Sequence, residues 1–345
     1  MTNNIQNKSL SYWLSSTPIT NYPTLTEDID VDIAIVGGGL AGISCAYLLQ
    51  NEGFNIAVVE ADRICQGATA HTTAKITSQH GLIYNKIKKQ LGEELARQYA
   101  EANETAISVI KKIIDENQID CDYVQQSAFV YTEQEKYIKE IEAEVKVSSE
   151  LGIKASYVEE IPFPIPIYSA VRFDNQAQFH PRKYVLSLAK IIHDNNVHIY
   201  ENTRAVNIEK DNKYTIITEQ GKKIKAEKVI IASQYPFYNK KGLYFSRLYP
   251  KRSHIVGIHV KEKYPGGMYI NAEEPARSLR SQNTGEKELI LVVGSNYTTG
   301  QSENTEKHYE ELIIFAKDIF TVEDIPYRWS TQDYITPDSI PSKER

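Results

Sequence analysis

The chain has 345 residues, of which 41% are hydrophobic and 24% are charged, and its formal net charge at pH 7 is −6. This length predicts about two domains with a large core, and the acidic balance gives no support for a nucleic-acid partner or an anionic membrane surface. No run approaches about 18 apolar residues, so we expect no membrane span. The odd cysteine count, with Cys45, Cys65 and Cys121 scattered, predicts neither disulfides nor a metal site and favours the cytoplasm.

The stretch from Asp32 to Glu60 predicts a strand, a tight turn, a helix and a second strand. Its parts are two short apolar runs, a glycine-rich turn and an apolar helical segment: Ile33–Val36, Gly37–Gly42, Ile43–Gln50 and Ile56–Val59. An acid, Glu60, ends the second run. This context is typical of a dinucleotide-binding unit, whereas the glycine spacing alone would also suit an ordinary turn of an α/β protein.

Each residue type of this motif has a structural role that explains its presence at that position. Gly37 makes the tight turn, Gly39 lets the backbone approach a pyrophosphate, and Gly42 lets helix and strand pack closely. The helix N-terminus, which includes Leu40 and Ala41, offers free N–H groups to phosphates. Glu60 is placed to accept hydrogen bonds from ribose hydroxyls. The motif does not choose between FAD and NAD(P).

The segment 61–80 has no regular period and is rich in small and hydroxyl residues. Because it follows the ribose-binding acid directly, we expect it to lie along the cofactor, although an ordinary polar loop is the alternative. The expected contact residues are Ala61, Gly67, Ala68, Thr69, His71, Thr72 and Thr73.

The remaining elements follow in order along the chain. Spacing of apolar residues predicts helices over 83–117 with a break at Gly92, over 132–152 and 306–320, and within 177–196, where Pro181 marks the helix start. Strands are predicted over 122–131, 197–200, 213–218, 222–225, 229–232, 253–260, 268–271 and 288–294. Three prolines within 161–167 exclude a central strand there and suggest a crossing between domains. The order predicts an α/β nucleotide domain that is split by an insertion, with a second, mostly antiparallel sheet.

Several further motifs, taken with the dinucleotide unit, resemble one enzyme family. They are GATAHTTA (67–74), AQFHP (177–181), ENTRAVNI (201–208), VIIAS (229–233), LYPKRS (248–253), WSTQD (329–333) and DSIP (338–341). From about Ser11 to Pro341 the chain resembles the D-amino-acid oxidase/glycine oxidase family of FAD-dependent oxidoreductases. Within it, the chain is most similar to a bacterial subgroup that often carries a C-terminal Rieske domain.

The resemblance implies FAD as the cofactor and a glutathione-reductase-like FAD-binding domain over 1–118 and 167–236. It implies a substrate domain over 119–166 and 237–333, and a shortened return to the first domain over 334–345. It places Ala205 at a segment that contacts adenine, and Ala232 and Ser233 beside the dinucleotide. The implied chemistry is oxidation of a CH–NH bond of an amino acid or amine by hydride transfer to flavin, with oxygen or an electron acceptor reoxidising the flavin.

The sequence departs from the family pattern in two places. The family continues after the D-x-x-P segment with a strand and a closing helix, whereas only four residues follow Pro341, so we expect a truncated chain. No Cys-x-His pair is present in these 345 residues, which predicts that they hold no Rieske cluster.

His71 stands where some relatives attach the flavin covalently, in a similar G-x-x-x-H loop. A histidine held by hydrogen bonds in an ordinary loop is the favoured interpretation, and covalent or direct flavin contact is the alternative.

Four residues are candidates for catalysis. Lys75 would place a cation near the flavin, or would be a surface lysine. Arg252 would bind a substrate carboxylate, with Arg277 and Arg280 as alternatives, or each would be a solvated arginine. His254 and Tyr269 lie on one predicted sheet and would line the pocket if their side chains point into it, or would be ordinary sheet residues.

Three functions are consistent with these patterns. The first is an FAD-dependent oxidoreductase acting on a small amine or amino acid. The second is a truncated, catalytically weak flavoprotein that works only as a binding or complex component. The third, an NAD(P)-dependent enzyme, is disfavoured by the motifs of the second half.

Overall fold

The computed structural model describes residues 10–238 and 243–337, in two compact units. Unit 1 consists of Met1–Tyr12, Thr73–His180 and Lys251–Thr331, and unit 2 of Trp13–Thr72, Pro181–Pro250 and Gln332–Arg345. The bounds of these units differ from those of the predicted domains, most plainly over 83–118, which belongs to unit 1. The functional domain boundaries stay a prediction. The motif at 338–341 lies outside the described residues.

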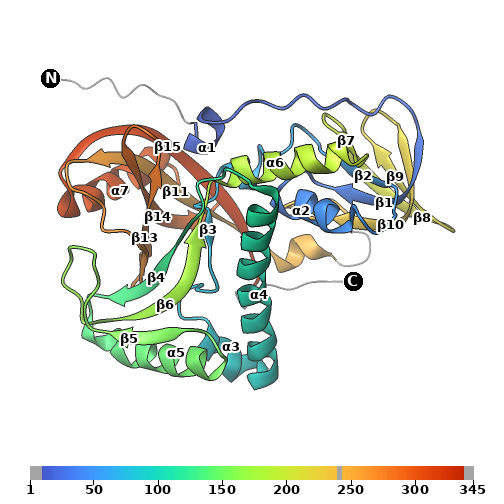
Figure 1. Cartoon of the computed structure of the whole chain (residues 1–345). Coiled ribbons are helices and arrows are strands. Elements are labelled where there is room, and N and C mark those ends of the chain that lie inside the picture. Colours follow the sequence, from blue (N-terminus) through green and yellow to red (C-terminus); the bar gives the residue numbers. More distant parts are fainter. Residues whose placement is uncertain (1–9, 239–242, 338–345) are drawn as a thin grey trace. The chain divides into compact units, whose positions relative to one another are not determined.

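Unit 2 is built on a six-stranded sheet with the order β7-β2-β1-β10-β9-β8 (Figure 1). Strands β7, β2, β1 and β10 run parallel, and β9 and β8 follow as an antiparallel meander. The elements are β1 (Ile29–Val36), α2 (Leu40–Leu49), β2 (Ile56–Val59), α6 (Pro181–Asp194), β7 (His198–Tyr200), β8 (Ala205–Lys210), β9 (Tyr214–Thr218) and β10 (Lys223–Ile231), with short turns α1 (Tyr12–Ser15), η1 (Ala68–Ala70) and η3 (Tyr244–Arg247).

The core of unit 2 follows from its apolar strands. All four residues of β2 and the last four of β1 are buried, as expected for parallel strands covered on both faces. Helices α2 and α6 pack side by side (Figure 1). Pro181 starts α6, where its missing N–H costs no helical hydrogen bond.

Unit 1 contains a nine-stranded mixed sheet with the order β15-β11-β14-β13-β12-β4-β6-β3, and β5 pairs with β6. The pair β12–β4 is parallel, and the other described pairs are antiparallel. The strands are β3 (Lys75–Ile76), β4 (Val124–Thr132), β5 (Ala155–Val158), β6 (Ser169–Gln178), β11 (Tyr249–Val260), β12 (Met268–Asn271), β13 (Arg277–Asn283), β14 (Glu288–Thr298) and β15 (Val322–Ile335).

The helices of unit 1 lie on this sheet and beside one another. They are α3 (Tyr84–Leu91), α4 (Glu93–Asn117), α5 (Ile138–Glu150) and α7 (Thr305–Ile319), with a short turn η2 (Glu135–Tyr137). Gly92 separates α3 from α4 with a φ of +88°, a conformation that favours glycine. Helix α5 covers β5 and β6 (Figure 1), and α7 packs on β14. Asn304 caps α7 by accepting hydrogen bonds from the N–H groups of Glu306 and Lys307.

The structure confirms the predicted α/β fold class and corrects several elements. The proline-rich segment 161–167 connects β5 to β6 within unit 1, and a crossing there between functional domains stays a prediction. Strands β3, β5, β6, β8, β13 and β15 were not predicted. The two strands predicted at 222–225 and 229–232 are one continuous strand, β10.

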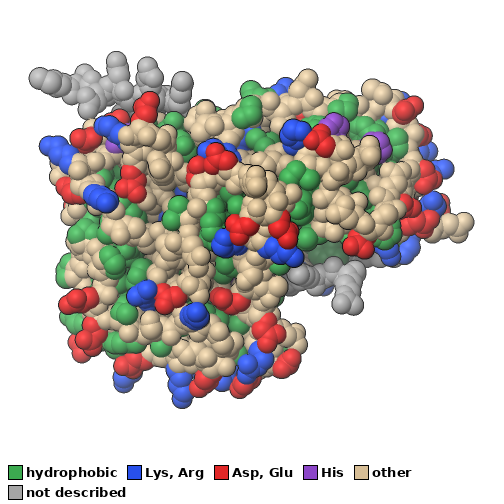
Figure 2. All heavy atoms as spheres, viewed as in Figure 1, with side chains coloured by type: hydrophobic (Ala, Val, Ile, Leu, Met, Phe, Trp, Pro, Cys, Tyr) green, Lys and Arg blue, Asp and Glu red, His purple; other side chains and the backbone are tan. Residues whose placement is uncertain are grey.

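Lys, Arg, Asp and Glu side chains alternate over the face shown in Figure 2 without a large area of one sign. Among the helices of residues 10–238 and 243–337, none is both long and apolar enough to cross a membrane.

Candidate cofactor site

The turn between β1 and α2 leaves no room for side chains. Gly37 has a φ of +115°, and a Cβ there would lie 2.6 Å from the carbonyl oxygen of Ala232, just after β10. A Cβ on Gly42 would lie 1.9 Å from the carbonyl oxygen of Gly37. Only glycine therefore lets β1, β10 and the first turn of α2 approach this closely.

The N-terminus of α2 is prepared for an anion. The Thr69 hydroxyl accepts a hydrogen bond from the Leu40 N–H at 2.9 Å. Within the described part of the chain, no hydrogen bond uses the N–H of Gly39 or Ala41. These donors and the positive end of the helix dipole can therefore bind a phosphate.

Glu60 is fixed by the backbone on both sides of its carboxylate. One oxygen accepts a hydrogen bond from the Gly38 N–H at 2.7 Å, and the other accepts one from the Asp62 N–H at 3.1 Å. Each carboxylate oxygen can accept a further hydrogen bond. Glu60 can therefore receive ribose hydroxyls without losing the contacts that orient it.

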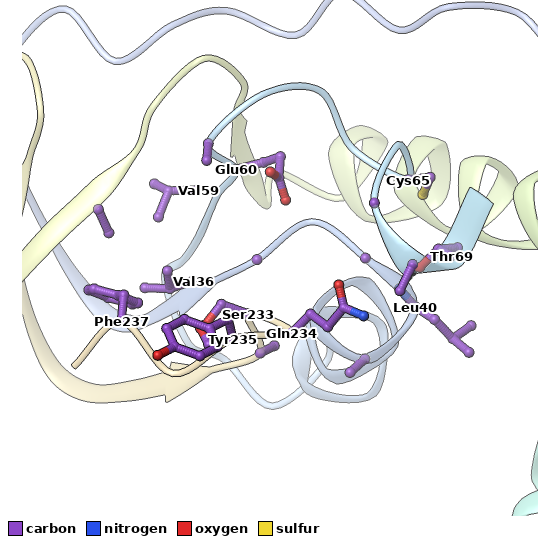
Figure 3. Close-up of a pocket in the computed structure, with 18 of the residues that line it drawn as sticks. Val36, Leu40, Val59, Glu60, Cys65, Thr69, Ser233, Gln234, Tyr235 and Phe237 are labelled. Atoms are coloured by element: carbon purple, nitrogen blue, oxygen red, sulfur yellow. Dashed lines mark hydrogen bonds between the residues drawn. The ribbon is translucent and has the colours of Figure 1, made fainter. Parts of the chain in front are cut away.

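These features border one cavity of about 510 Å³ in unit 2, within the usual range for cofactor sites. Its lining comes from the ends of β1, β2 and β10 and from the loops that follow them: Val36, Gly37, Gly39, Leu40, Ala41, Val59, Glu60, Ala61, Cys65, Gly67, Ala68, Thr69, Arg204, Ala205, Ala232, Ser233, Gln234, Tyr235 and Phe237. In Figure 3, Glu60 and Val59 lie above the end of β1, whereas Ser233, Gln234 and Tyr235 lie below it. The residues present therefore fit a dinucleotide.

Most of the predicted cofactor residues line this cavity. Gly42 does not line it but shapes the turn, and His71, Thr72 and Thr73 are not part of the lining. His71 Nδ1 lies 2.8 Å from the Gly67 carbonyl oxygen, and the Thr72 carbonyl accepts a hydrogen bond from the Trp13 indole N–H. Thr73 belongs to unit 1. Contact of these three residues with the cofactor stays a prediction.

Seven lining residues were not predicted to bind the cofactor: Val36, Val59, Cys65, Arg204, Gln234, Tyr235 and Phe237. The signal that could have identified them is topological. Residues that follow the carboxyl ends of parallel strands gather at one edge of a sheet, and 232–237 follow β10 as Glu60 follows β2. Arg204 directly precedes β8, next to the predicted Ala205.

Two of the four predicted catalytic residues, Tyr269 and His254, are buried in unit 1. Tyr269 is fully buried between Phe129 and Phe163, with ring centroids 5.1 and 4.8 Å away, and its hydroxyl donates to the Gly266 carbonyl at 2.8 Å. Burial raises the pKa of Tyr269. It borders a second cavity, of about 500 Å³, also in unit 1.

His254 is 1% exposed and stacks on His308, with ring centroids 4.9 Å apart. Burial, with the nearby His308 second, lowers the pKa of His254 to about 4, so its imidazole is neutral at physiological pH. This environment fits a structural role, and the predicted catalytic role is untested.

The other two predicted catalytic residues make polar contacts. Arg252 donates a hydrogen bond to the Ser330 hydroxyl at 2.8 Å. Lys75 donates one to the Ser278 hydroxyl. Burial, and secondarily the charge of Arg280, lowers the pKa of the Lys75 ammonium to about 7.

The sheet register separates these candidates. Tyr269 pairs with Leu279, and both belong to the core packed against α7. Because side chains alternate along a strand, Ser278 faces away from α7. Lys75, which contacts Ser278, therefore lies on the face opposite Tyr269, and the structure does not bring all four candidates together. No group of three or more His, Cys, Asp or Glu in the described ranges could hold a metal ion.

Replacing Glu60 with glutamine is expected to weaken FAD binding about 10-fold to 100-fold, because hydrogen bonds to a charged carboxylate contribute about 1.5–3 kcal/mol. Titration of the apoprotein with FAD, followed by flavin fluorescence, measures the change. Glu227→Gln is the control, because Glu227 is an exposed carboxylate of unit 2 that pairs with Lys213 at 3.1 Å, and neither residue lines the cavity. An unchanged FAD affinity in Glu60→Gln would contradict the assignment.

Comparison with known proteins agrees with this site. The family model described as "FAD dependent oxidoreductase" matches residues 32–345. The chain is 40% identical over 331 residues to a Bacillus subtilis (strain 168) protein named as a Rieske 2Fe-2S iron-sulfur protein, YhfW, covering 96% of this chain and 65% of that protein. It is 26% identical over 233 residues to the gamma-glutamylputrescine oxidoreductase of Escherichia coli (strain K12), covering 66% of this chain and 54% of that enzyme.

Solved structures share the fold. Glycine oxidase from Geobacillus kaustophilus gives a TM-score of 0.71 at 16% identity, with 90% of this chain and 85% of that chain covered. L-amino acid deaminase from Proteus vulgaris gives 0.72 at 16% identity, with 94% and 83% covered. The glycine turn, the acid after β2 and the family match agree, and the chain belongs to the family of FAD-dependent oxidoreductases, whose cofactor is FAD.

Proposed function

We propose that this chain oxidises a CH–NH bond of a small amino acid or secondary amine. The observation that carries the proposal is the cavity of unit 2, in which a glycine turn, a helix N-terminus and Glu60 together fit FAD. The E. coli relative named as an oxidoreductase of gamma-glutamylputrescine supports an amine as substrate. The neighbours named glycine oxidase and L-amino acid deaminase share the fold.

The chain's residues divide the work of holding the cofactor. The N–H groups of Gly39 and Ala41 would bind the pyrophosphate, Glu60 would bind the ribose, and Ala205 with Arg204 would border the adenosine end. FAD, when bound, supplies the two-electron acceptor that takes the hydride of the substrate C–H, which leaves a C=N bond. An external acceptor, such as oxygen, must then remove the electrons.

We propose Lys75 as the catalytic residue among the four candidates. Its ammonium is partly buried, contacts a neutral hydroxyl, and has a pKa of about 7. A cation in such a site is stabilised strongly by a neighbouring negative charge, such as a substrate carboxylate or a reduced flavin.

The three cysteines, all of them free, support a reducing compartment such as the cytoplasm.

The experiment is anaerobic mixing of the FAD-loaded protein with a panel of amino acids, N-methyl amino acids and polyamines, followed by the loss of flavin absorbance. We expect at least one amine to bleach the flavin, whereas matched hydroxy acids leave it oxidised. A loaded protein that dithionite bleaches but no amine does would contradict the proposal. A protein that takes up no FAD would favour the alternative of a weak flavoprotein that acts only within a complex.

A further inference from the structure

Glu201 is a fully buried carboxylate that joins two distant segments of unit 2. It follows β7 directly and is 0% exposed. One oxygen accepts hydrogen bonds from the Ile64 N–H at 2.9 Å and from the Thr20 hydroxyl, and the other accepts one from the Tyr22 N–H at 3.0 Å. The carboxylate therefore fixes the loop after β2 and the lead-in segment before β1.

Arg182, near the start of α6, binds the same two segments from its own side. It is 1% exposed, and burial lowers the pKa of its guanidinium. It donates to the carbonyls of Cys65 and Pro18, each at 2.8 Å, and to the Thr17 hydroxyl at 2.7 Å. Two opposite buried charges thus satisfy the backbone groups of adjacent residues, Ile64 and Cys65.

Those two residues rest directly on the glycine turn. The Cys65 N–H donates to the Gly38 carbonyl at 3.0 Å. A Cβ on Gly38 would lie 2.5 Å from Ile64 Cγ2, so the glycine turn and the segment after β2 are in close contact. The segment then continues to Gly67, Ala68 and Thr69, which line the cavity, and Thr69 accepts a hydrogen bond from the first N–H of α2.

We infer that Glu201 and Arg182 are positioning residues that hold the segment 64–69 in the conformation that binds the cofactor. Neither residue lines the cavity. Burying a charge costs free energy, and a buried charge persists only where it is well hydrogen-bonded. Here the charges satisfy N–H and C=O groups that would otherwise be buried without partners, which apolar side chains could not do. The inference rests on FAD as the occupant, as the proposed function does.

The test is the FAD dissociation constant of Glu201→Gln, together with the visible circular dichroism of the bound flavin and the melting temperature of the apoprotein. Glutamine keeps the shape but places an NH₂ group against a backbone donor. We expect an affinity loss of about 10-fold or more at a temperature where the variant is folded, with an altered flavin dichroism. Arg182→Lys, which retains the charge but not the three-way contact, provides a second variant with the same expected loss.

A matched control is Glu144→Gln in unit 1. Glu144 is also 0% exposed and also accepts two backbone hydrogen bonds, from the N–H groups of Tyr84 at 2.8 Å and Asn85 at 2.9 Å. We expect a lower melting temperature and an unchanged FAD affinity. The inference is overturned if both test variants bind FAD like the wild type, or if Glu144→Gln weakens FAD binding equally. Failure of the proposed function, by contrast, would appear as bound flavin that no amine reduces.

Discussion

Replacing Gly42 with alanine is expected to abolish FAD binding and to destabilise unit 2 by about 3 kcal/mol, the upper part of the range for overpacking. The added Cβ would stand 1.9 Å from the Gly37 carbonyl oxygen, far inside van der Waals contact. The turn cannot easily move away, because the Gly37 N–H is bonded to the Val59 carbonyl at 2.8 Å and the Ala232 N–H to the Val36 carbonyl at 2.8 Å. FAD titration and urea unfolding measure the two effects.

Gly53→Ala separates this effect from a general cost of losing a glycine. Gly53 has a φ of +78°, and a Cβ there would meet no atom within 4 Å. We expect a loss of about 1 kcal/mol from backbone strain and an unchanged FAD affinity. A Gly42→Ala protein that binds FAD within threefold of the wild type would show that the turn is not the site.

The nucleotide unit could be predicted from the sequence because its determinants are local. The tight turn requires glycine at Gly37 and Gly42, the last four residues of β1 and all of β2 are apolar, and Glu60 follows the second strand directly. Backbone conformation, burial and the motif therefore point to the same structure in one stretch of about thirty residues.

There is a physical reason why several strands of unit 1 could not be predicted from the sequence. Strand β13 reads RSLRSQN, and six of its seven residues are buried although most are polar. Its polar groups are satisfied by distant partners, such as the Ala74 carbonyl for Arg280 and Asp122 for Gln282. The periodicity of apolar residues along the sequence does not reveal such a hydrogen-bond network.

Strand β15 contains a proline, Pro326, which by itself argues against a central strand. Proline lacks the N–H needed in a central strand but is tolerated at an edge, and β15 is the edge strand next to β11. Only the tertiary order of strands reveals that position.

The candidate site likewise contains residues that could be predicted from the sequence and residues that could not. Residues of the glycine motif and the loop after it were predicted because they are close in sequence. Arg204, Tyr235 and Phe237 required the knowledge that β10 lies beside β1. The separation of Lys75 from Tyr269 required the register of β12 and β13, which the sequence does not specify.

Replacing Lys75 with methionine is expected to raise stability at pH 6.5 while it lowers the rate of flavin reduction. Burial holds the native pKa near 7, below the ordinary value of 10.5, so the folded state disfavours the proton. Between about pH 7 and pH 10 the unfolded chain binds more protons than the native one, and the stability of the wild type should therefore rise with pH. At about 1.4 kcal/mol for each tenfold change in proton affinity, the full effect is roughly 5 kcal/mol.

The side chain is partly exposed, so we expect a gain of about 2 kcal/mol in the variant at pH 6.5, after allowing for solvent screening. The rise in melting temperature between pH 7 and pH 9 should largely disappear. If the ammonium stabilises negative charge at the reaction centre, the rate of flavin reduction should fall about 10-fold or more. Such an exchange of stability for activity is common where a charged group is held in an unfavourable environment for function.

Two variants make the Lys75 test specific. Lys75→Arg retains a cation and should keep more activity than Lys75→Met. Lys190→Met, at a side chain that is 74% exposed, should change neither stability nor its pH dependence. Melting curves from pH 6 to pH 9 and anaerobic reduction rates give both readouts. A Lys75→Met protein that is less stable than the wild type at pH 6.5 would show that the contact with Ser278 outweighs the cost of burial. Full activity in that variant would remove Lys75 from the reaction centre, because a cation required there cannot be replaced by a thioether.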